Sequence, residues 1–357
     1  MPNFANLLIR WQQQHGRHDL PWQGTQNPYL IWVAEIMLQQ TQVKTVIPFY
    51  QRFIETFPTI AALAKADLDD VLAMWSGLGY YARGRNLHKA AGVIMNDYQG
   101  KFPTCSSEIQ KLPGIGRTTA AAIAAFCYGE PCTILDGNVK RVLARYFGIE
   151  GYPGLSATQQ RLWEKAEAVL PRGNTQKNMP VYTQALMDLG AIICTRTSPR
   201  CTACPLQSHC TAFLENRISC LPTPKPSKAL PSKETVFLLL LHHDKLLLEK
   251  RVNQGIWKEL WCLPEAEKND HYQNYCAQML GIDAVCVDLL LPPIDHTFTH
   301  FKLRMYTQRL QVKSIIQQPQ CNPIRWVTTD EAFQLAIPTA IKKILSKYRA
   351  ASTPTSL

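Results

Sequence analysis

The sequence has no long apolar run and no segment that resembles a secretory signal. Its longest run of large apolar residues, VFLLLL at 236–241, has the length of a strand, whereas a membrane-spanning helix needs about 18–20 apolar residues. The first 17 residues, MPNFANLLIRWQQQHGR, have neither an extended apolar core nor a small-residue cleavage site. We therefore expect a cytoplasmic protein with no membrane partner.

The sequence also has no cationic tail, although it is basic. The formal net charge is +11 over 357 residues. Residues 1–220 carry 21 Lys and Arg against 15 Asp and Glu, and residues 221–357 carry 17 against 12. Two basic halves can both face a polyanion such as nucleic acid, although solubility alone explains the same charge. The length predicts two domains.

Alternating strand patterns are missing before residue 230, where apolar residues recur at helical spacing. Residues 221–233, LPTPKPSKALPSK, hold four Pro and predict an extended linker. After it, a hairpin is expected around 242–245, one long strand over 296–312 and closing helices over 331–349. We predict a helical domain over 1–220, a linker over 221–233, an α+β domain over 234–350 and a flexible tail over 351–357. The predicted helical stretches of the first domain are 29–56, 68–76, 84–97, 117–127, 137–147, 158–169 and 180–193.

Four of the 12 cysteines are clustered in the spacing C-x6-C-x2-C-x5-C. In a reducing compartment, thiols or metal ligands are expected in place of disulfides. Four sulfur ligands suit zinc or an iron–sulfur cluster, and the single C-x2-C favours [4Fe–4S] because zinc ribbons usually pair two such knuckles. Four unrelated buried thiols are the alternative. The candidate ligands are Cys194, Cys201, Cys204 and Cys210.

The segment LPGIGRTTAAAIAAF (112–126) predicts a helix, a glycine-rich turn and a second helix. Gly114 and Gly116 allow a sharp turn and close approach of the backbone to another group. The second helix begins at Arg117 and Thr118, where free backbone N–H groups and the Arg117 charge favour phosphate. An ordinary turn between helices explains the same pattern.

Two carboxylates stand in contrasting surroundings. Glu35 is the only charge in PYLIWVAEIMLQQT (28–41), and a buried, unpaired carboxyl tends to keep its proton, as a general acid requires. A Glu that meets solvent or a buried Arg is an equal alternative. Asp136 precedes a helix in TILDGNVKRVL (133–143), where an N-cap is the commoner role. Held by backbone N–H groups, it is expected to stay ionised, and such a pair suits cleavage of a glycosidic bond.

Together these segments resemble the helix-hairpin-helix DNA glycosylases with an iron–sulfur loop, and among them the MutY-type adenine DNA glycosylase family. The resemblance covers nearly the whole chain. It implies a multidomain fold, with a mainly α glycosylase domain followed by an α+β Nudix-like domain. The matching motifs are DLPWQ (19–23), EIMLQQTQV (35–43), GLGYYARGRNL (77–87), LPGIGRTTAAAI (112–123), ILDGNVKRVLAR (134–145), the four-Cys loop and HTFTHF (296–301).

The resemblance also implies roles for individual residues. Glu35 would protonate the adenine leaving group, Asp136 would stabilise the sugar cation, and Asn138 would help to hold this centre. Gln40 and Tyr80 would enter the DNA helix beside the lesion, as base flipping requires, although Tyr80 alone reads equally well as a packing residue. The implied DNA and base contacts are Gln40, Thr41, Tyr80, Gly114, Gly116, Arg117, Thr118, Phe298, Thr299 and His300.

Thr118 bears on the reaction type. In related bifunctional glycosylases the matching position is a Lys that forms a Schiff base, so Thr118 implies hydrolysis without strand cleavage. Lys111 and Lys140 lie nearby in the sequence and leave room for a weak lyase activity.

The second domain matches a Nudix fold without its paired Glu residues, which implies that the domain has lost hydrolysis. In this family it reads 8-oxoguanine through a loop that matches Phe298, Thr299 and His300. From the pattern alone, HTFTH is a plain strand. The implied substrate is duplex DNA with adenine opposite 8-oxoguanine or guanine, bound by a monomer that carries a [4Fe–4S] cluster.

Three alternatives stay open. The first is a bifunctional glycosylase and lyase of the endonuclease III type, against which Thr118 and the second domain both argue. The second is a non-catalytic DNA-binding protein with a structural cluster, which would not need an isolated Glu35. The third is a Nudix hydrolase acting on nucleotides.

Overall fold

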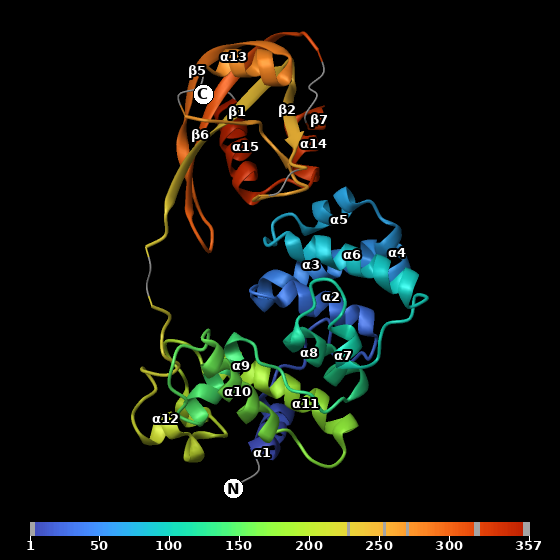
Figure 1. The fold of residues 1–357 in the computed structure, drawn as a ribbon, viewed down its shortest axis with the longest axis vertical. Coiled ribbons are helices and arrows are strands. Elements are labelled where there is room, and N and C mark those ends of the chain that lie inside the picture. Colours follow the sequence, from blue (N-terminus) through green and yellow to red (C-terminus); the bar gives the residue numbers. More distant parts are fainter. Residues whose placement is uncertain (1–3, 227–228, 253–254, 269–270, 318–321, 353–357) are drawn as a thin grey trace, which may run out of the picture. The chain divides into compact units, whose positions relative to one another are not determined.

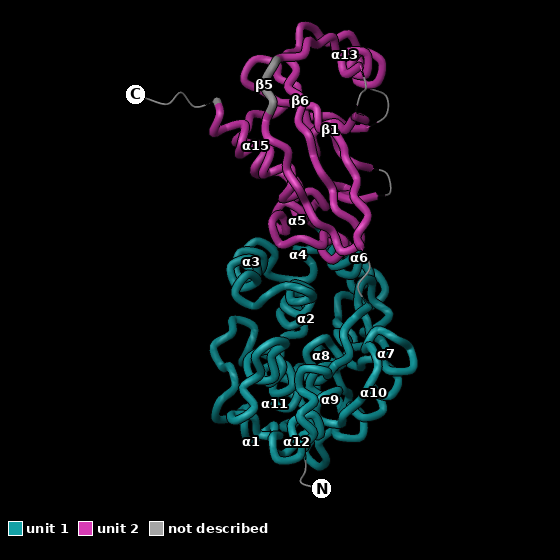
Figure 2. The backbone as a smooth tube through the Cα atoms, turned by 90° about the vertical axis from the view of Figure 1, so that its left-hand side faces the viewer, with its two compact units in different colours: residues 1–65, 86–227 teal, residues 66–85, 228–357 magenta. Residues whose placement is uncertain are grey.

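The computed structural model of the chain describes residues 4–226, 229–252, 255–268, 271–317 and 322–352. The chain divides into two compact units, which Figure 2 shows in different colours. The first unit contains residues 1–65 and 86–227, and the second contains residues 66–85 and 228–357. No helix in the described ranges is both long and apolar enough to cross a membrane.

The first unit is helical, with helices close to the predicted positions (Figure 1). Its cysteine segment contains only short turns of helix, and a π-helical turn, η1, precedes that segment. The elements are α1 (Phe4–His15), α2 (Pro28–Leu38), α3 (Val43–Thr56), α4 (Ile60–Lys65), most of α6 (Ala82–Asp97), α7 (Ser106–Ile109), α8 (Arg117–Tyr128), α9 (Gly137–Tyr146), α10 (Ser156–Ala168), α11 (Thr175–Asp188), η1 (Leu189–Ile193), η2 (Cys201–Ala203), η3 (Gln207–His209) and α12 (Thr211–Leu214).

Helix α8 is buried along most of its length. Every residue from Thr119 to Ala125 is buried, and five of these seven are alanines. Such small side chains let neighbouring helices approach closely, and α8 contacts both α2 and α11. Helix α2, which carries Glu35, therefore lies beside α8, the second helix of the glycine hairpin (Figure 1).

The helical pattern predicted over 29–56 is interrupted in the structure. Helix α2 begins at Pro28, where the Asn27 side chain accepts a hydrogen bond from the Tyr29 backbone N–H at 3.0 Å, and it ends at Leu38. Gln40 then adopts a left-handed conformation with φ 57°, and α3 begins at Val43. The apolar spacing is maintained across this break, which is why periodicity alone joined the two helices.

The second unit is built on a twisted, mixed sheet, which confirms the predicted α+β class. The strand order is β3-β2-β1-β6-β5, with β4 paired to β1 and β7 paired to β2. The predicted hairpin is present, since His242 pairs with Lys245, and β1 runs parallel to β6. The strands are β1 (Ser232–His242), β2 (Lys245–Lys250), β3 (Trp261–Cys262), β4 (Glu265–Ala266), β5 (Ile282–Thr297), β6 (Lys302–Ile315) and β7 (Ile324–Val327).

Helices complete the second unit near the predicted positions. They are α5 (Leu68–Trp75), α13 (Tyr272–Tyr275), the π-helical turn η4 (Cys276–Leu280), α14 (Thr329–Gln334) and α15 (Thr339–Ser352). Helix α15 includes residues 351 and 352, the first two of the predicted tail, and residues 353–357 lie outside the described residues.

The segment 66–85 belongs to the second unit because its polar groups bond to that unit. The Lys250 ammonium lies 2.6 Å from an Asp69 carboxylate oxygen. The hydroxyls of Ser76 and Tyr81 both donate to the Ile337 carbonyl, at 2.8 and 3.0 Å. No local pattern in the sequence indicates these long-range contacts.

The long strand predicted over 296–312 is interrupted near its start, and its remainder is present as β6. Strand β5 ends at Thr297 and β6 begins at Lys302, so residues 298–301 form a loop between antiparallel strands. The Phe298 N–H donates to the Phe301 carbonyl at 2.8 Å and closes this turn. The turn contains no Gly, Pro, Asn or Asp, and its alternating sequence F-T-H-F gave no signal of a break.

Candidate active site and metal centre

Glu35 lines a cavity of about 730 Å³ in the first unit. The wall combines apolar side chains, such as Trp22 and Phe126, with polar ones, such as Arg17 and Gln184. A cavity with apolar walls and converging polar groups is typical of a ligand site, and this one is large enough for a flat aromatic base. The predicted acid therefore lines a pocket and is only partly exposed.

The pKa of Glu35 lies far above that of a free carboxyl. Burial among the apolar side chains of α2, with a smaller contribution from the charge of Asp136, raises this pKa to about 8. At neutral pH the Glu35 carboxyl therefore holds its proton. Of the two interpretations that the sequence left open, the surroundings of Glu35 favour the protonated acid.

Asp136 is the N-cap of α9, and its Oδ1 accepts from the Val139 N–H at 2.7 Å. Burial raises the pKa of Asp136, while the backbone N–H groups of Val139 and Asn138 and the charges of Arg141 and Lys140 lower it. The sequence predicted that backbone donors hold Asp136 ionised. Those donors are present, but burial acts against them. The charge of Asp136 in turn raises the pKa of Glu35.

Asn138 and Thr118 make hydrogen bonds to residues that lie close to Asp136 in the chain. The Asn138 Oδ1 accepts from the Arg141 guanidinium at 2.8 Å, and the same guanidinium donates to the Gly190 carbonyl at 2.7 Å. A Cβ on Gly190 would lie 2.6 Å from the Asn138 Cβ, so only glycine fits there. The Thr118 hydroxyl accepts from the Leu135 N–H at 3.3 Å and joins α8 to the residue before Asp136.

A buried ion pair behind the cavity was not predicted. Asp188 is fully buried and accepts from the Arg17 Nε at 2.7 Å and from the Gln184 Nε2 at 2.8 Å. Both donors line the cavity. A carboxylate inside the protein is stable only with such partners. Arg17 and Asp188 are 171 positions apart, so no sequence spacing indicates this pair.

The glycine hairpin has the predicted turn but a shorter first helix. Gly114 has φ 79°, and a Cβ there would lie 2.6 Å from the Asn86 Cβ. Gly116 is the N-cap of α8. Arg117 is exposed, with its guanidinium 3.8 Å from the Trp163 ring centroid and ion-paired to Glu167. These positions suit contact with a phosphate backbone.

Gln40 and Tyr80 share an uncommon backbone conformation. Gln40 is exposed with φ 57°, and Tyr80 is 47% exposed with φ 50°. The Arg83 guanidinium lies 5.3 Å from the Tyr80 ring centroid and donates to the Gly79 carbonyl at 3.1 Å. Thr41 follows Gln40 and donates from its hydroxyl to the Gln39 carbonyl at 3.3 Å. Exposed residues with a strained backbone conformation are common at binding sites.

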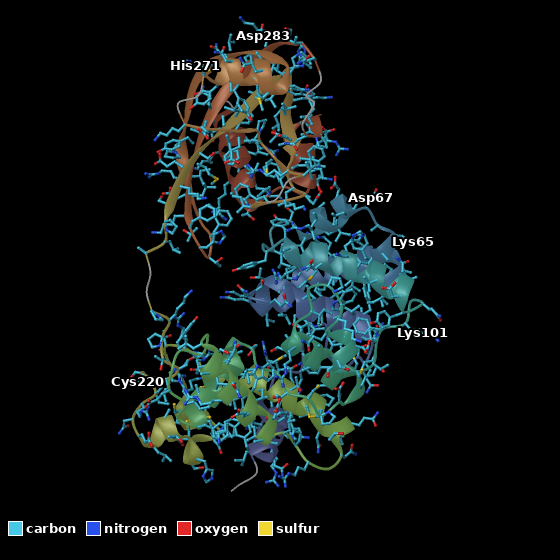
Figure 3. All side chains as sticks on the ribbon, viewed as in Figure 1. Lys65, Asp67, Lys101, Cys220, His271 and Asp283 are labelled. Atoms are coloured by element: carbon cyan, nitrogen blue, oxygen red, sulfur yellow. The ribbon has the colours of Figure 1, made fainter. Side chains whose placement is uncertain are left out.

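The four clustered cysteines line one small cavity of about 20 Å³. Arg145, only 3% exposed, donates to the Cys194 Sγ at 3.4 Å and to the Thr195 carbonyl at 2.7 Å. Among the described residues, no group of three or more His, Cys, Asp or Glu side chains could hold a metal ion as placed. Four soft thiols around one cavity nevertheless match the donor set of an iron–sulfur cluster. Cys220, labelled in Figure 3, is exposed and is not part of the cavity wall.

In the second unit, the 298–301 loop has an aromatic base and a polar tip. Phe298 is half-buried and stacks on Phe301 with ring centroids 4.6 Å apart. Thr299 and His300 are exposed at the tip, 3.4 Å apart between hydroxyl and Nδ1. The three residues predicted to read a base therefore form a loop with two polar side chains free to meet a ligand.

Comparison with known proteins bears on both units. Residues 33–168, which include Glu35 and Asp136, match the HhH-GPD superfamily of base excision DNA repair proteins, and residues 235–347 match the NUDIX domain. An adenine DNA glycosylase of Buchnera aphidicola subsp. Acyrthosiphon pisum (strain APS) is 37% identical over 347 residues, with 97% of each chain covered. The adenine DNA glycosylase of Homo sapiens is 31% identical over 97% of this chain and 74% of its own length.

Among solved structures, a thermostable thymine-DNA glycosylase aligns with a TM-score of 0.53 and 30% identity over 59% of this chain and 95% of its own. The aligned share is close to the length of the first unit and shows its glycosylase fold. The predicted helix-hairpin-helix and Nudix-like classes are confirmed. Because similarity to adenine DNA glycosylases extends over nearly the whole length of both chains, this chain belongs to the adenine DNA glycosylase family.

Proposed function

We propose that this chain hydrolyses the N-glycosidic bond of adenine in duplex DNA, where adenine is mispaired with 8-oxoguanine or guanine. The observation that carries the proposal is the protonated Glu35 in a cavity large enough for a base, with Asp136 close enough to raise its pKa. A carboxyl that keeps its proton beside a second one held by backbone N–H groups suits cleavage through an oxocarbenium-like state.

The geometry supports the following sequence of steps. The adenine leaves the base stack and enters the cavity. Glu35 donates its proton to the base, at N7, so that the bond from N9 to the sugar breaks with both electrons on the base. Ionised Asp136 stabilises the positive charge that develops on the sugar. A water then adds to the sugar carbon and gives its proton to the Glu35 carboxylate, which regenerates the acid and leaves an abasic site and neutral adenine.

The reaction is proposed to stop at the abasic site. Thr118 has no amine with which to form a Schiff base. Lys140 lies in the first turn of α9, and burial lowers the pKa of its ammonium while Asp136 raises it. Lys140 is therefore the residue to follow if a covalent adduct forms.

A panel of duplexes tests this function. Purified full-length protein in excess should release adenine from A:8-oxoguanine and A:G pairs, and little from A:T, because a paired base opposes flipping. Borohydride added during the reaction should trap little covalent adduct. Release of thymine or an oxidised pyrimidine without release of adenine would show that the proposal is wrong. Strong borohydride trapping would instead favour the bifunctional alternative.

We also propose that Cys194, Cys201, Cys204 and Cys210 hold a [4Fe–4S] cluster. The donor set and the common cavity support this choice. When bound, the cluster would supply a rigid cross-link between chain segments that otherwise contain only short helical turns. Arg145 would fix this loop to α9 and to the Leu221 carbonyl, which its Nε contacts at 2.8 Å.

Replacing Cys204 by Ser is expected to remove the bound iron and the brown visible absorption, and to lower the melting temperature of the protein. Cys220→Ser is the matched control, since Cys220 is exposed and absent from the cavity wall. Metal analysis should give about four irons per chain in the parent and the control. One zinc per chain, with no iron, would contradict the cluster assignment.

A further inference from the structure

Trp257 has a backbone conformation that tryptophan rarely adopts. It lies in the turn between β2 and β3 with φ 62°, and its side chain is only 9% exposed. Positive φ is costly for a bulky residue and persists only where the surroundings hold it in place. The residues in contact with Trp257 therefore indicate why this conformation is maintained.

The Trp257 ring lies between the core of the second unit and the 298–301 loop. Its centroid is 6.2 Å from that of Phe237, a fully buried residue of β1. On the loop side it is 5.7 Å from the Phe298 ring and 6.2 Å from the His296 ring. Trp257 thus connects Phe298 to the buried strand β1, beside the direct contact of Phe298 with His296 of β5.

The turn that carries Trp257 is itself held by Arg251. The Arg251 guanidinium lies 5.6 Å from the Trp257 ring centroid and is ion-paired to Glu265. The Arg251 backbone donates to the Leu260 carbonyl at 3.0 Å and accepts from the Glu259 N–H at 2.7 Å. With the turn tied on both sides, the Trp257 ring has little freedom to move away from Phe298.

Phe298 in turn determines where the polar tip of the loop lies. Its ring packs on His296 and Phe301, both at 4.6 Å between centroids, while Thr299 and His300 extend into solvent. The two exposed residues follow Phe298 directly in the chain. A displacement of the Phe298 ring would therefore move the hydroxyl of Thr299 and the imidazole of His300.

We propose that Trp257 is a positioning residue for the 298–301 loop and thereby determines the preference for 8-oxoguanine over guanine opposite adenine. This inference rests on the proposed function of the loop. The two bases differ only by an oxygen at C8 and a proton at N7, so the reading groups must be held within about 0.5 Å of the productive geometry. Trp257 supplies that constraint from the core side.

The test compares adenine release from A:8-oxoguanine and A:G duplexes with full-length protein in excess. Trp257→Ala should lower the ratio of the two rates by about two- to tenfold, the range expected from losing aromatic pairs. The rate on A:G should change little, because the Glu35 cavity is untouched. Trp326→Ala is the matched control: Trp326 is on β7 and packs on His242. It should keep the parent ratio.

Two further variants make each result decisive. Trp257→Leu, which keeps apolar volume without a ring, replaces the alanine variant if thermal melting shows that the latter is not folded. A folded Trp257 variant with the parent ratio would overturn the inference. The double variant Thr299→Ala/His300→Ala tests the loop itself: if it keeps the parent ratio, the proposed reading role fails and the inference fails with it. If it loses the preference while folded Trp257 variants keep it, only the role of Trp257 is wrong.

Discussion

Replacement of Glu35 by Gln is expected to lower adenine release by a factor on the order of 10³, within the range that general acid catalysis contributes. Gln has nearly the same shape as the protonated acid but donates no proton to the leaving base. Substrate affinity should change little, because the carboxyl that Gln replaces is neutral at the pH of the assay. Single-turnover release and DNA binding measured on the same duplex separate the two quantities.

A matched control uses the same chemical change elsewhere. Glu215 is exposed and follows α12, where it pairs with Arg217 on the surface. Glu215→Gln should therefore leave release at the parent rate. Near-parent turnover by Glu35→Gln would remove Glu35 as the acid, and a parallel loss of DNA binding would instead assign it a binding role.

The pH dependence of adenine release by the parent enzyme should show the titration of Glu35. Glu35 is protonated below its pKa of about 8, so release should fall by about tenfold per unit as pH rises above that value. At the acid side, release should fall as Asp136 gains its proton, at a higher pH than for a free aspartate because burial raises its pKa. The alkaline limb should be missing from the residual activity of Glu35→Gln.

Protein stability gives a readout that does not depend on turnover. The folded pKa of Glu35, about 8, lies above the ordinary value of 4.5, so the unfolded chain releases this proton first. The contribution of Glu35 to the free energy of unfolding is fully present below pH 4.5 and is lost as the pH rises toward 8. Gln does not titrate, so melting temperatures of the parent and variant should diverge across this window, with the variant more stable on the alkaline side.

The raised pKa of Glu35 was one of the outcomes that the sequence left open, and its signal is local because desolvation depends on the surrounding residues. One carboxyl among apolar residues at every helical face indicates a helix that can bury it. The convergence of the cysteines was likewise indicated by spacing, since four thiols within 17 residues are joined by a short chain. In both cases the signal and the feature lie within one short segment.

Features that depend on distant segments left no trace in the sequence. Arg17 and Gln184 in the cavity wall are both held by Asp188. Asp188 reaches Arg17 only when α11 packs against the start of the chain. The positive φ of Trp257 is similar, because it is maintained by Phe237 of β1 and Phe298 of the 298–301 loop. Local propensity argues against that conformation, and tertiary packing overrides it.

Replacement of Asp136 by Asn is expected to lower adenine release by about 10²- to 10³-fold with little change in stability. Asn is as good an N-cap as Asp, so its Oδ1 can accept the Val139 N–H that Asp136 accepts at 2.7 Å. The variant therefore keeps the start of α9 and removes only the negative charge beside the sugar. Melting temperature and single-turnover release measured together should show this separation.

Asp136→Ala provides the contrast, since it removes both the cap and the charge. It should lose activity to the same extent and cost about 1 kcal/mol of stability in addition. Asn174→Ala is the matched control for the cap alone, because Asn174 caps α11 through the Lys177 N–H at 3.2 Å. That control should lose stability and keep adenine release.

Replacing Asp136 should also change the pKa of Glu35. The Asp136 charge is one of the causes that raise the pKa of Glu35, so Asp136→Asn should lower it. The alkaline limb of the residual activity should then move to lower pH than in the parent. A variant with parent activity would refute the role of Asp136 in stabilising the sugar cation. A limb that stays in place would show that the two groups do not interact, and the burial of Glu35 alone would then account for its retained proton.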